Sequence, residues 1–447
     1  MFYIMKQKNN NRRQFIKNLS LAVLGTSALG KGSFAMKSHG RAPVKAKAPE
    51  IMKYKTLGRT GFRVSDIASG APNNETVLKA MLNAGVNFID TGHTYGNGNN
   101  ERMIGKVLKD YDRKKIFINT KLYTEGKAFE SKEQVIKMTR EALERLQTDY
   151  VDCLMIHSAD NSRIVKDESF HSAMDQLKAE GRVRSTGVSC HGSAWYKLPE
   201  ETIDKVLLTA AATNKFDVFE MTYNFVNKDL AHKVFDACDK KNIGRAIIKS
   251  SPVQIYKILE KAVARYEEQG KDPGEDYYAY LNRYEERAKK ARSFFKKYGY
   301  TTDEELINAA IIYVLQNPRA HTVCLDIRNL EDVSRYLALS GQALQAPQAS
   351  LLQDYQDHFG FLNCHIGCNE CEKACPHHVP VNHILRYNYY YQNKKDEKEA
   401  MKLYADLPSD KKADHCLSCP GYCEQACPND VSARQLMAMA HQNLSFA

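Results

Sequence analysis

The sequence has no apolar run long enough to cross a membrane near its N-terminus. Its uncharged stretch there, Leu19 to Gly30, is twelve residues long. At about 1.5 Å rise per residue, a helix of that length cannot span the roughly 30 Å of a bilayer core. A membrane anchor is therefore disfavoured, and no stable membrane span is expected. The stretch also lacks cysteine, which argues against a lipoprotein anchor.

Outside its first fifty residues the chain has almost no excess of positive charge. Residues 1–50 hold ten Lys or Arg and one acidic residue, and the remainder holds 54 basic and 52 acidic residues. Most of the formal net charge of +11 therefore lies in the leader. Binding to nucleic acid requires a basic patch on the folded domain. No nucleic-acid partner is expected.

The leader carries an export motif. The segment Asn11-Arg12-Arg13-Gln14-Phe15-Ile16-Lys17, followed by the uncharged stretch and by Ser33-Phe34-Ala35, resembles a twin-arginine signal. We expect a signal peptide over residues 1–35 and a linker rich in Ala, Pro and Lys over 36–52. The twin-arginine translocase would then be a partner during export, and the protein would be periplasmic or otherwise exported. That route carries folded proteins, often with cofactors already inserted.

No Gly-x-Gly-x-x-Gly motif follows a predicted strand, so a Rossmann nucleotide site is not indicated. Instead, short apolar segments alternate with helix-period segments, which favours a closed α/β (β/α)8 TIM barrel over a doubly wound sheet. Tyr54 to Ser65 is expected to form a hairpin ahead of the barrel. The eight strands are expected near Ile67, Phe88, Phe117, Leu154, Val188, Phe219, Ile247 and Val323, and the helices near 74–84, 100–110, 131–146, 170–180, 200–213, 229–241, 302–316 and 330–340.

Four ionisable residues fall at or just beyond the ends of successive predicted strands: Asp90, Tyr95, Lys121 and His157. In a parallel barrel the catalytic side chains lie at that end. Hydride transfer to a carbonyl creates an oxyanion that needs a proton, and Tyr95 is a candidate donor. A nearby Lys121 cation would lower the pKa of the tyrosine. Asp90 would hold Lys121, and His157 could donate to the oxyanion. A surface or core role for each is the alternative.

The segments "NFIDTGHTYGNGNNERMIGKVL" and "VDCLMIH", which carry Asp90, Tyr95 and His157, resemble signatures of the aldo-keto reductases, with Lys121 between them in the same order. The resemblance covers roughly residues 53–340 and implies a barrel over 53–342. It implies Asp90, Tyr95, Lys121 and His157 as the catalytic residues. It also implies a small-molecule carbonyl or alcohol substrate and NADP(H) as the cofactor.

The same resemblance implies a set of nucleotide contacts. Ser189 would bind the nicotinamide amide, and Tyr223 would stack on the nicotinamide ring. Glu220 stands where the family usually has Gln, Cys190 where it usually has Asn, and Asp326 where it usually has Gly. A carboxylate can accept from an amide but cannot donate to its carbonyl. The remaining contacts, to phosphate and adenosine groups, would come from Lys249, Ser250, Arg328 and Asn329.

Residues 251–300 are an insertion in the seventh βα loop, on the active-site face of a barrel. They contain eleven basic and eight acidic residues, and a capping-box pattern at 302–305 opens the next helix. The segment is expected to form two charged helices. It is either a solvated decoration, or a lid or dock for the C-terminal region.

Eight of the twelve cysteines lie between positions 364 and 427. They form two runs, Cys-x3-Cys-x2-Cys-x3-Cys-Pro and Cys-x2-Cys-x3-Cys-x3-Cys-Pro, about forty residues apart. Disulfides in an exported chain and zinc bound by four thiolates are the alternatives to an iron–sulfur site. The duplicated Cys-Pro endings favour iron–sulfur ligands. The ligand candidates are Cys364, Cys368, Cys371, Cys375, Cys416, Cys419, Cys423 and Cys427.

These runs resemble bacterial dicluster ferredoxin modules, in which the fourth cysteine of each run binds the other cluster. The resemblance implies two [4Fe–4S] clusters. Cys364, Cys368, Cys371 and Cys427 would bind one, and Cys416, Cys419, Cys423 and Cys375 the other. Helix-like sequence from Ile384 to Leu407 predicts a small α-helical dicluster ferredoxin-like domain over residues 343–447.

The sequence as a whole resembles the aldo-keto reductases that carry a C-terminal ferredoxin-type region. It predicts an exported oxidoreductase that reduces or oxidises a carbonyl or alcohol with NADP(H), with electrons passing through two clusters to or from an unidentified partner. The alternative is an iron–sulfur electron-transfer or docking protein whose barrel is catalytically idle. The altered nicotinamide contacts favour that alternative, and the four catalytic residues disfavour it.

Overall fold

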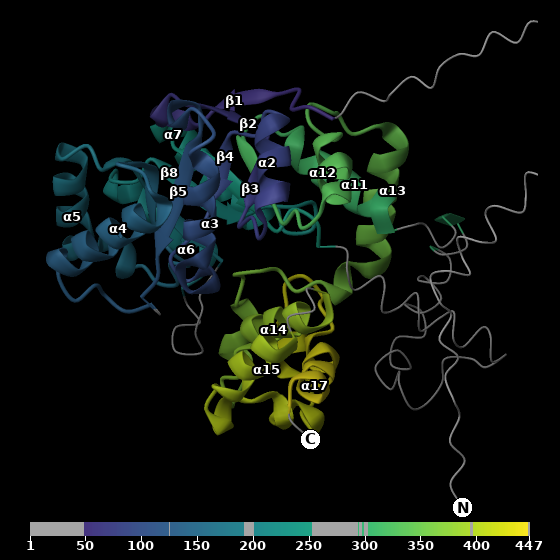
Figure 1. The fold of residues 1–447 in the computed structure, drawn as a ribbon. Helices are drawn as coiled ribbons and strands as arrows, with labels where there is room; N and C mark the ends of the chain where they lie inside the picture. The colour runs from purple at the N-terminus through teal and green to yellow at the C-terminus, as the bar shows by residue number, and fades with distance from the viewer. Residues whose placement is uncertain are drawn as a thin grey trace, which may run out of the picture. The chain divides into compact units, whose positions relative to one another are not determined.

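The computed structural model describes residues 49–124, 126–191, 201–252, 294, 297–298, 303–393 and 397–445 (Figure 1). The predicted signal peptide, all but the end of the linker, and nearly all of the 251–300 insertion lie outside these residues. The described residues belong to one compact unit that begins at Ala48.

A short hairpin precedes a closed parallel barrel. Strand β1 (Tyr54–Thr56) pairs with β2 (Arg63–Ser65) in antiparallel fashion. The barrel then closes in the order β10-β3-β4-β5-β6-β7-β8-β9. Each expected strand position falls within one of these strands, so the predicted α/β barrel is confirmed. The strands are β3 (Ile67–Gly70), β4 (Phe88–Asp90), β5 (Phe117–Leu122), β6 (Val151–Ile156), β7 (Val183–Cys190), β8 (Val218–Thr222), β9 (Gly244–Ile248) and β10 (Thr322–Leu325).

Helices connect the strands and cover the outside of the barrel. Side chains at the N-caps accept backbone hydrogens at several of them, as Asn74, Ser131, Asp167 and Thr202 do. Such caps satisfy amide groups that have no partner within the helix. The helices are α2 (Glu75–Asn83), α3 (Asn99–Leu108), α4 (Lys132–Leu146), α5 (Glu168–Ala179), α6 (Ile203–Thr213), α7 (Asp229–Lys241), α11 (Asp303–Leu315) and α12 (Leu330–Leu337).

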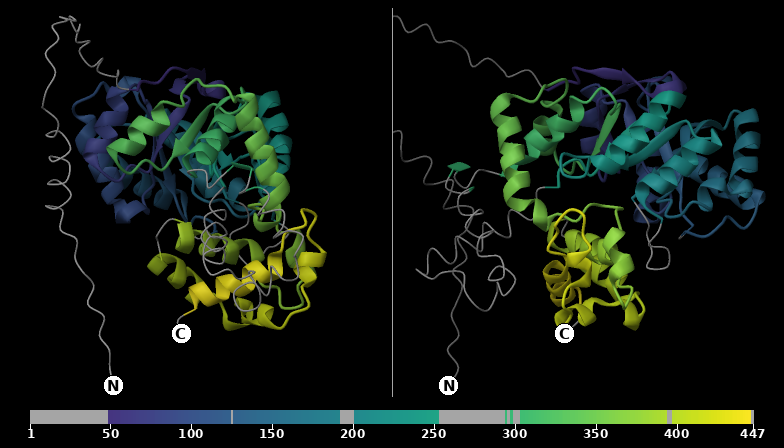
Figure 2. Two further views of the ribbon diagram at one scale, coloured as in Figure 1. Left: turned by 90° about the vertical axis from the view of Figure 1, so that its right-hand side faces the viewer. Right: turned by 180° about the vertical axis from the view of Figure 1, so that it is seen from behind.

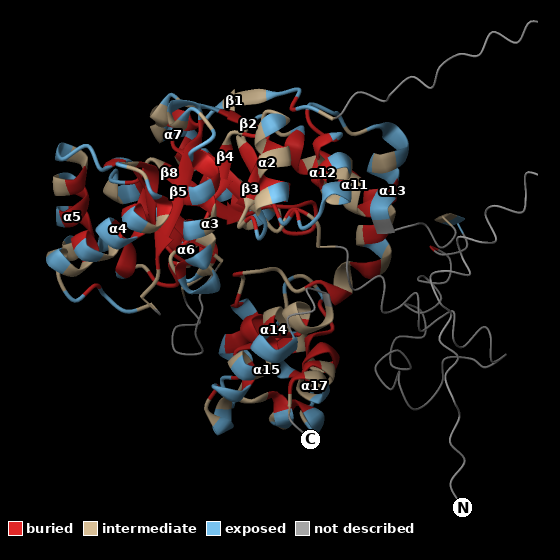
Figure 3. Cartoon of the chain, in the orientation of Figure 1, coloured by how far each residue is buried: buried red, intermediate tan, exposed pale blue. Residues whose placement is uncertain are grey.

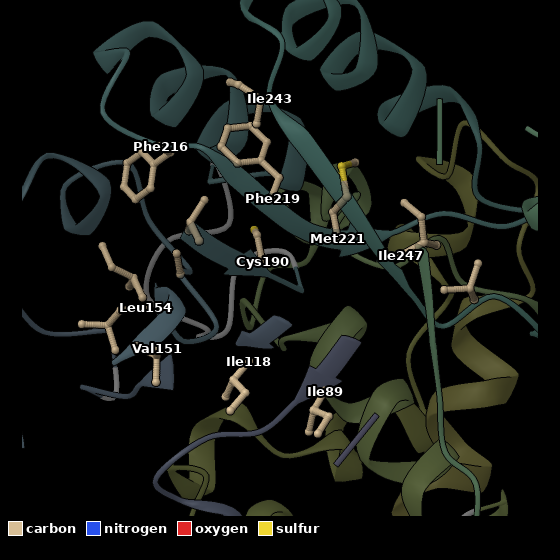
Figure 4. Packing of buried hydrophobic residues seen from close by; sticks show 14 of the residues in the cluster. Ile89, Ile118, Val151, Leu154, Cys190, Phe216, Phe219, Met221, Ile243 and Ile247 are labelled. Atoms are coloured by element: carbon tan, nitrogen blue, oxygen red, sulfur yellow. The ribbon is translucent and has the colours of Figure 1, made fainter. Parts of the chain in front are cut away.

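Side chains alternate between the two faces of each strand and form two apolar layers, one inside the barrel and one between the strands and the helices. Phe88 and Phe117 stack inside the barrel with ring centroids 5.0 Å apart. The neighbouring residues Ile89 and Ile118 belong instead to the large cluster between strands and helices (Figure 4). Because successive side chains on a strand point to opposite faces, polar residues spaced by two from Phe88 and Phe117 also face the interior. Asp90, Asn119 and Lys121 are among them.

A helical region follows the barrel, as expected from the sequence. In Figures 1 and 2, α14 (Val381–Asn393), α15 (Glu397–Ala405) and α17 (Ala433–Leu444) form a group of their own, whereas α13 (Ala346–Phe359) lies beside the barrel helix α11. Figure 3 shows buried residues within the region. The segment between α12 and α13 contains the expected domain boundary at 342/343. The helices are α13 (Ala346–Phe359), α14 (Val381–Asn393), α15 (Glu397–Ala405), α16 (Tyr422–Gln425) and α17 (Ala433–Leu444).

The helical region shares a hydrophobic cluster with the barrel. Phe225 and Val226, which follow β8, belong to the same buried cluster as Tyr355 of α13. The Asn227 amide donates to the Ile366 carbonyl at 3.0 Å, and the Ile203 N–H donates to the Gly367 carbonyl at 3.1 Å. The loop that begins the first cysteine run is therefore bonded directly to barrel segments. Among the described residues, no helix is both long enough and apolar enough to span a bilayer.

Candidate active site

The four predicted catalytic residues come together at the C-terminal ends of three neighbouring strands. Asp90 ends β4, Lys121 lies near the end of β5, and His157 directly follows β6. Tyr95 opens a short 3-10 helix, η2 (Tyr95–Gly98), in the loop after β4. The parallel register of β4, β5 and β6 places these strand ends side by side.

Lys121 is fully buried, and its charge is balanced by carboxylates. Its Nζ contacts Asp90 Oδ1, donates to the Thr91 carbonyl at 3.0 Å, and lies 3.4 Å from Glu220 Oε2. Burial alone would lower the pKa of this amine, but Asp90 and Glu220 raise it well above its ordinary value. Lys121 therefore stays a cation throughout the neutral pH range.

Tyr95 faces both His157 and Lys121. Its hydroxyl lies 3.4 Å from His157 Nε2, and Lys121 Nζ lies 5.2 Å from the centre of its ring. Burial raises the pKa of Tyr95, Lys121 lowers it, and Asp90 and Glu220 raise it again, so that the net direction is upward. The sequence led us to expect that Lys121 would lower this pKa. That contribution is present, but burial and the two carboxylates outweigh it, and Tyr95 is a neutral phenol.

His157 is a neutral imidazole in this setting. Burial holds its pKa well below the ordinary value, and the charges of Lys121 and His93 lower it further. Its Nδ1 is buried and has no hydrogen-bond partner among the described residues. A neutral imidazole has one N–H donor and one acceptor nitrogen. His157 can thus donate one hydrogen bond beside the Tyr95 hydroxyl without carrying a charge.

Glu220 is a member of this site that sequence reasoning placed only at the nucleotide. It lies on β8 and is buried. The Asn119 amide nitrogen donates to Asp90 Oδ1 at 2.7 Å and to Glu220 Oε2 at 3.5 Å. Burial and the neighbouring Asp90 raise the pKa of Glu220 to about 8, while Lys121 opposes that shift. The even spacing from Val218, which faces the barrel interior, could have indicated this inward position.

The residues that were expected to contact the nucleotide do not all lie at the same site. Ser189 is buried at the end of β7, where its Oγ accepts from the Ser158 N–H at 2.8 Å. Lys249 directly follows β9 with a φ of 55°, and Ser250 beside it is buried. Lys249 Nζ lies 5.2 Å from the centre of the Tyr390 ring. Ser189, Lys249 and Ser250 thus lie at strand ends of the barrel, as the sequence predicted.

Tyr223 lies elsewhere. It is buried in the layer between strands and helices, where its ring packs against Phe235 of α7 and Tyr313 of α11. The Asn317 side chain donates to its hydroxyl at 2.9 Å. Its position, an odd number of residues from the inward Glu220, explains this outward placement. The structure does not bring Tyr223 to the four catalytic residues.

Arg328 and Asn329 are held by local interactions at the start of α12. Arg328 donates to Asp326 Oδ2 at 2.8 Å, and Asn329 caps the helix by accepting from the Asp332 N–H at 2.8 Å. The carboxylate of Asp326, which replaces a glycine usual in the resembled family, therefore pairs with the predicted phosphate ligand.

A profile of the aldo/keto reductase family matches residues 56–355. This chain belongs to the aldo/keto reductase family. It is 33% identical over 132 residues to a probable voltage-gated potassium channel subunit beta of Oryza sativa, covering 26% of this chain and 40% of that protein. It is 34% identical over 156 residues to L-galactose dehydrogenase of Arabidopsis thaliana, covering 31% of this chain and 48% of the relative.

Among solved structures, the family member AKR11C1 from Bacillus halodurans, in its holo form, aligns with 69% of this chain and 99% of its own. The identity is 22% and the TM-score 0.49. The curated relatives are matched over about half of their own length, from 40% to 62%. The family assignment establishes an aldo/keto reductase barrel of the oxidoreductase type.

In this aldo/keto reductase the first group of cysteines surrounds one cavity beyond the barrel. Four cysteines line a cavity of about 20 Å³, together with Asn382 and Pro428. The Asn382 amide donates to Cys364 Sγ at 3.3 Å, and the Val431 N–H donates to Cys427 Sγ at 3.4 Å. The four are the set that the sequence assigned to one cluster: Cys364, Cys368, Cys371 and Cys427.

The cysteines of the second group also lie near one another. Burial raises the pKa of Cys416 to about 12, and the nearby thiols of Cys423, Cys375 and Cys419 raise it in turn. The Val379 N–H donates to Cys375 Sγ at 3.5 Å, and the Gly421 N–H donates to Cys419 Sγ at 3.4 Å. All eight thiols are free of disulfide bonds. Within the described residues, no three His, Cys, Asp or Glu side chains converge closely enough to bind one metal ion.

Proposed function

We propose that this aldo/keto reductase interconverts a small carbonyl compound and its alcohol, with Tyr95 as the proton donor and acceptor. The observation that carries the proposal is the buried contact of Tyr95 with His157 beside the Lys121–Asp90 pair. NADP(H), when bound, would supply or accept the hydride. The residues of the chain move the proton and stabilise the charge on the carbonyl oxygen.

The roles follow from the charge state of each group. Tyr95 is a neutral phenol and so carries the proton that the developing alkoxide requires. The neutral imidazole of His157 can donate a hydrogen bond to the same oxygen. Lys121 is the cation that contacts Asp90 among the described residues, and it stabilises the phenolate that remains after transfer. Asp90 fixes the position of the amine.

Part of the expected nucleotide site fits NADP(H). Ser189 accepts one hydrogen bond but can still donate its hydroxyl hydrogen to a nicotinamide amide. Lys249 and Ser250 provide a cation and a hydroxyl for phosphate. Tyr223 and Arg328 do not support the site in the same way, because one packs against helices and the other pairs with Asp326.

We further propose that the C-terminal region is a ferredoxin-type domain with two [4Fe–4S] clusters. One would be held by Cys364, Cys368, Cys371 and Cys427, and the other by Cys416, Cys419, Cys423 and Cys375. The proposal is supported by four thiols around one cavity and by N–H donors directed at sulfur, a contact that tunes cluster potentials. Each thiolate of such a cluster binds a different iron atom, so the sulfurs need not converge as they would around a single ion.

The clusters would carry single electrons between the barrel and an external partner. The leader, which lies outside the described residues, would direct the folded protein through the twin-arginine translocase to the periplasm or beyond. Free NADPH is not expected to be replenished there. Under this proposal the nucleotide is loaded before export and retained, with the 251–300 insertion as its cover.

An idle barrel attached to an electron-transfer or docking domain is the second candidate. Two observations favour it: Glu220 makes a second carboxylate contact to Lys121, and Tyr223 lies away from the site. This candidate predicts bound iron and sulfide without carbonyl reduction. The first candidate predicts both.

The deciding experiment uses full-length protein purified without oxygen. We expect bound NADP(H) in the preparation and multiple turnovers of a carbonyl substrate with a reduced one-electron donor. Turnover with the donor but not with added NADPH supports retained nucleotide and electron transfer through the clusters. Sustained turnover with added NADPH alone contradicts that electron route, and the absence of turnover with either reductant contradicts the enzymatic proposal.

A further inference from the structure

A cavity of about 130 Å³ lies where the barrel loops after β8 and β9 meet α14 and α17. Engineered protein cavities of about 150 Å³ bind a single benzene ring. The space is therefore the size of one ring or a short branched chain. It is distinct from the contact of Tyr95 with His157, because neither residue lines it.

Most of the wall is apolar. Val226 and Pro252 contribute from the barrel loops, and Leu385 and Met439 contribute from the C-terminal helices. Apolar surface of this kind favours the hydrocarbon part of a ligand. Cys364 is also part of the lining, so a molecule in the cavity lies against the first cysteine group as well as the barrel rim.

Two cations stand in this apolar lining, one from each side. Lys249 follows β9 of the barrel, and Arg386 belongs to α14. None of the described residues that line the cavity is acidic. Arg386 donates to the His191 carbonyl at 3.4 Å and forms no ion pair with a described carboxylate. The charge of Arg386 also acts on the carboxyl groups of Asp160 and Glu372, but neither of them lines the cavity. The cavity therefore combines apolar walls with a guanidinium that no lining carboxylate pairs.

Lys249 and Arg386 both affect the pKa of one buried residue, His191. Burial holds the pKa of His191 well below its ordinary value, and the next contributions come from Lys249 and then Arg386. The amine of Lys249 also lies 5.7 Å from the centre of the Tyr389 ring, which lines the cavity. Lys249 and Arg386 both line the cavity, and both lie near enough to His191 to lower its pKa.

We propose that this cavity binds a small organic anion, with a carboxylate or phosphate between Lys249 and Arg386 and an apolar body against Leu385 and Met439. Arg386 can bind either group through two parallel hydrogen bonds. This site shares Lys249 with the phosphate contact proposed for NADP(H) and adds Arg386 of the C-terminal region, which that proposal does not include. It does not depend on the carbonyl chemistry proposed for Tyr95. It would make ligand binding depend on the C-terminal region, because the barrel alone supplies only one of the two cations.

The test measures binding by calorimetry to full-length protein kept without oxygen, with benzoate and phenyl phosphate as probes. We expect the wild type to bind at least one probe. Arg386→Gln should weaken that binding at least about tenfold, since a hydrogen bond to a charged group contributes about 1.5–3 kcal/mol. Lys402→Gln, which removes an exposed charge from α15, should bind as the wild type does.

Two further variants distinguish loss of the binding site from loss of the fold. Met439→Trp adds bulk to the cavity without changing charge and should also abolish probe binding, while Arg386→Lys should retain part of it. NADPH then identifies the source of the anion: displacement of phenyl phosphate indicates a nucleotide phosphate, and coexistence indicates a separate molecule. Failure of both probes to bind the wild type overturns the proposal, as does wild-type affinity in both Arg386→Gln and Met439→Trp.

Discussion

The barrel site and the cysteine groups are both largely buried, but they satisfy their polar atoms in opposite ways. In the barrel, Lys121, Asp90, Asn119 and Glu220 bind one another. Among the cysteines, sulfur accepts hydrogen bonds from backbone and amide N–H groups, as Cys427 does from Val431. The barrel residues neutralise their own charges. The cysteines of the first set instead line one cavity, where the proposed cluster would be bound.

This contrast predicts that a cysteine variant changes metal content and leaves the barrel folded. Cys368→Ser or Cys419→Ser should abolish turnover driven by a one-electron donor, because each removes a proposed cluster ligand. Iron and acid-labile sulfide should fall from about eight of each per chain toward four. Metal analysis and donor-driven assays would measure this.

The matched control is Cys238→Ser, since Cys238 is a buried thiol in α7 and belongs to neither group. It should keep full iron content. Stoichiometric zinc without sulfide in the wild type would remove the basis of the comparison, because a zinc site would not carry electrons.

The barrel side of the comparison is tested by removing one oxygen atom. Tyr95→Phe should lower turnover by about 10²–10⁴-fold, because it deletes the proton donor, and should leave iron content and nucleotide binding unchanged. Single-turnover kinetics would measure the chemical step. Tyr111→Phe removes a phenol that donates an exposed hydrogen bond to Asn83, and this variant should turn over normally. Equal rates in the two variants would show that Tyr95 is not the acid.

A substitution in the core tests how much the apolar layer inside the barrel contributes to the stability of the fold. Phe88→Ala removes a ring that stacks on Phe117 below Asp90, and should destabilise the fold by about 3–5 kcal/mol. Leu330→Ala changes an exposed residue and should cost under about 0.5 kcal/mol. Urea denaturation, monitored by circular dichroism, would compare them. A similar small cost for both would show that the inner layer is not the stable core described here.

The smallest predicted effect concerns Glu220 and pH. Its folded-state pKa of about 8 lies above the ordinary value of 4.5. A carboxyl group with a raised pKa favours the folded state below its unfolded pKa and loses that contribution as pH rises through the folded value. Glu220→Gln should therefore gain stability relative to the wild type as pH rises from about 4.5 to about 8. A difference in urea midpoint that is constant over that range would contradict this.

The sequence could predict that most of the candidate site residues lie together, because strand ends in a parallel barrel share one edge. The positions of Asp90, Lys121 and His157 could be predicted from that rule and from the apolar runs that precede them. The contact of Glu220 with Lys121 was missed because it crosses the barrel interior between β8 and β5, which are not neighbouring strands. Tyr223 was misplaced because a family position was applied without the strand alternation, which turns it toward α7 and α11.

The cysteine groups were predicted from spacing and resemblance, and the structure places the four thiols of the first set around one cavity. Spacing alone could not pair the runs, because Cys427 lies 56 residues beyond Cys371 and joins it only through the fold. The cavity beside Arg386 had no sequence signature. It is lined by the loops after β8 and β9, by residues 362–366, and by α14 and α17, and its two cations are more than one hundred residues apart.

The hydrogen bonds from Ile203 and Asn227 to the loop between Cys364 and Cys368 bear on how such a chain can be recombined. The acceptors are backbone carbonyls of Gly367 and Ile366, so their positions depend on the course of that loop rather than on its side chains. An unrelated C-terminal module fused to this barrel would leave the Asn227 amide without its acceptor. The barrel and the C-terminal region therefore cannot be exchanged independently of each other. A chimera that keeps these contacts would have to include the residues after β8 together with the loop between Cys364 and Cys368.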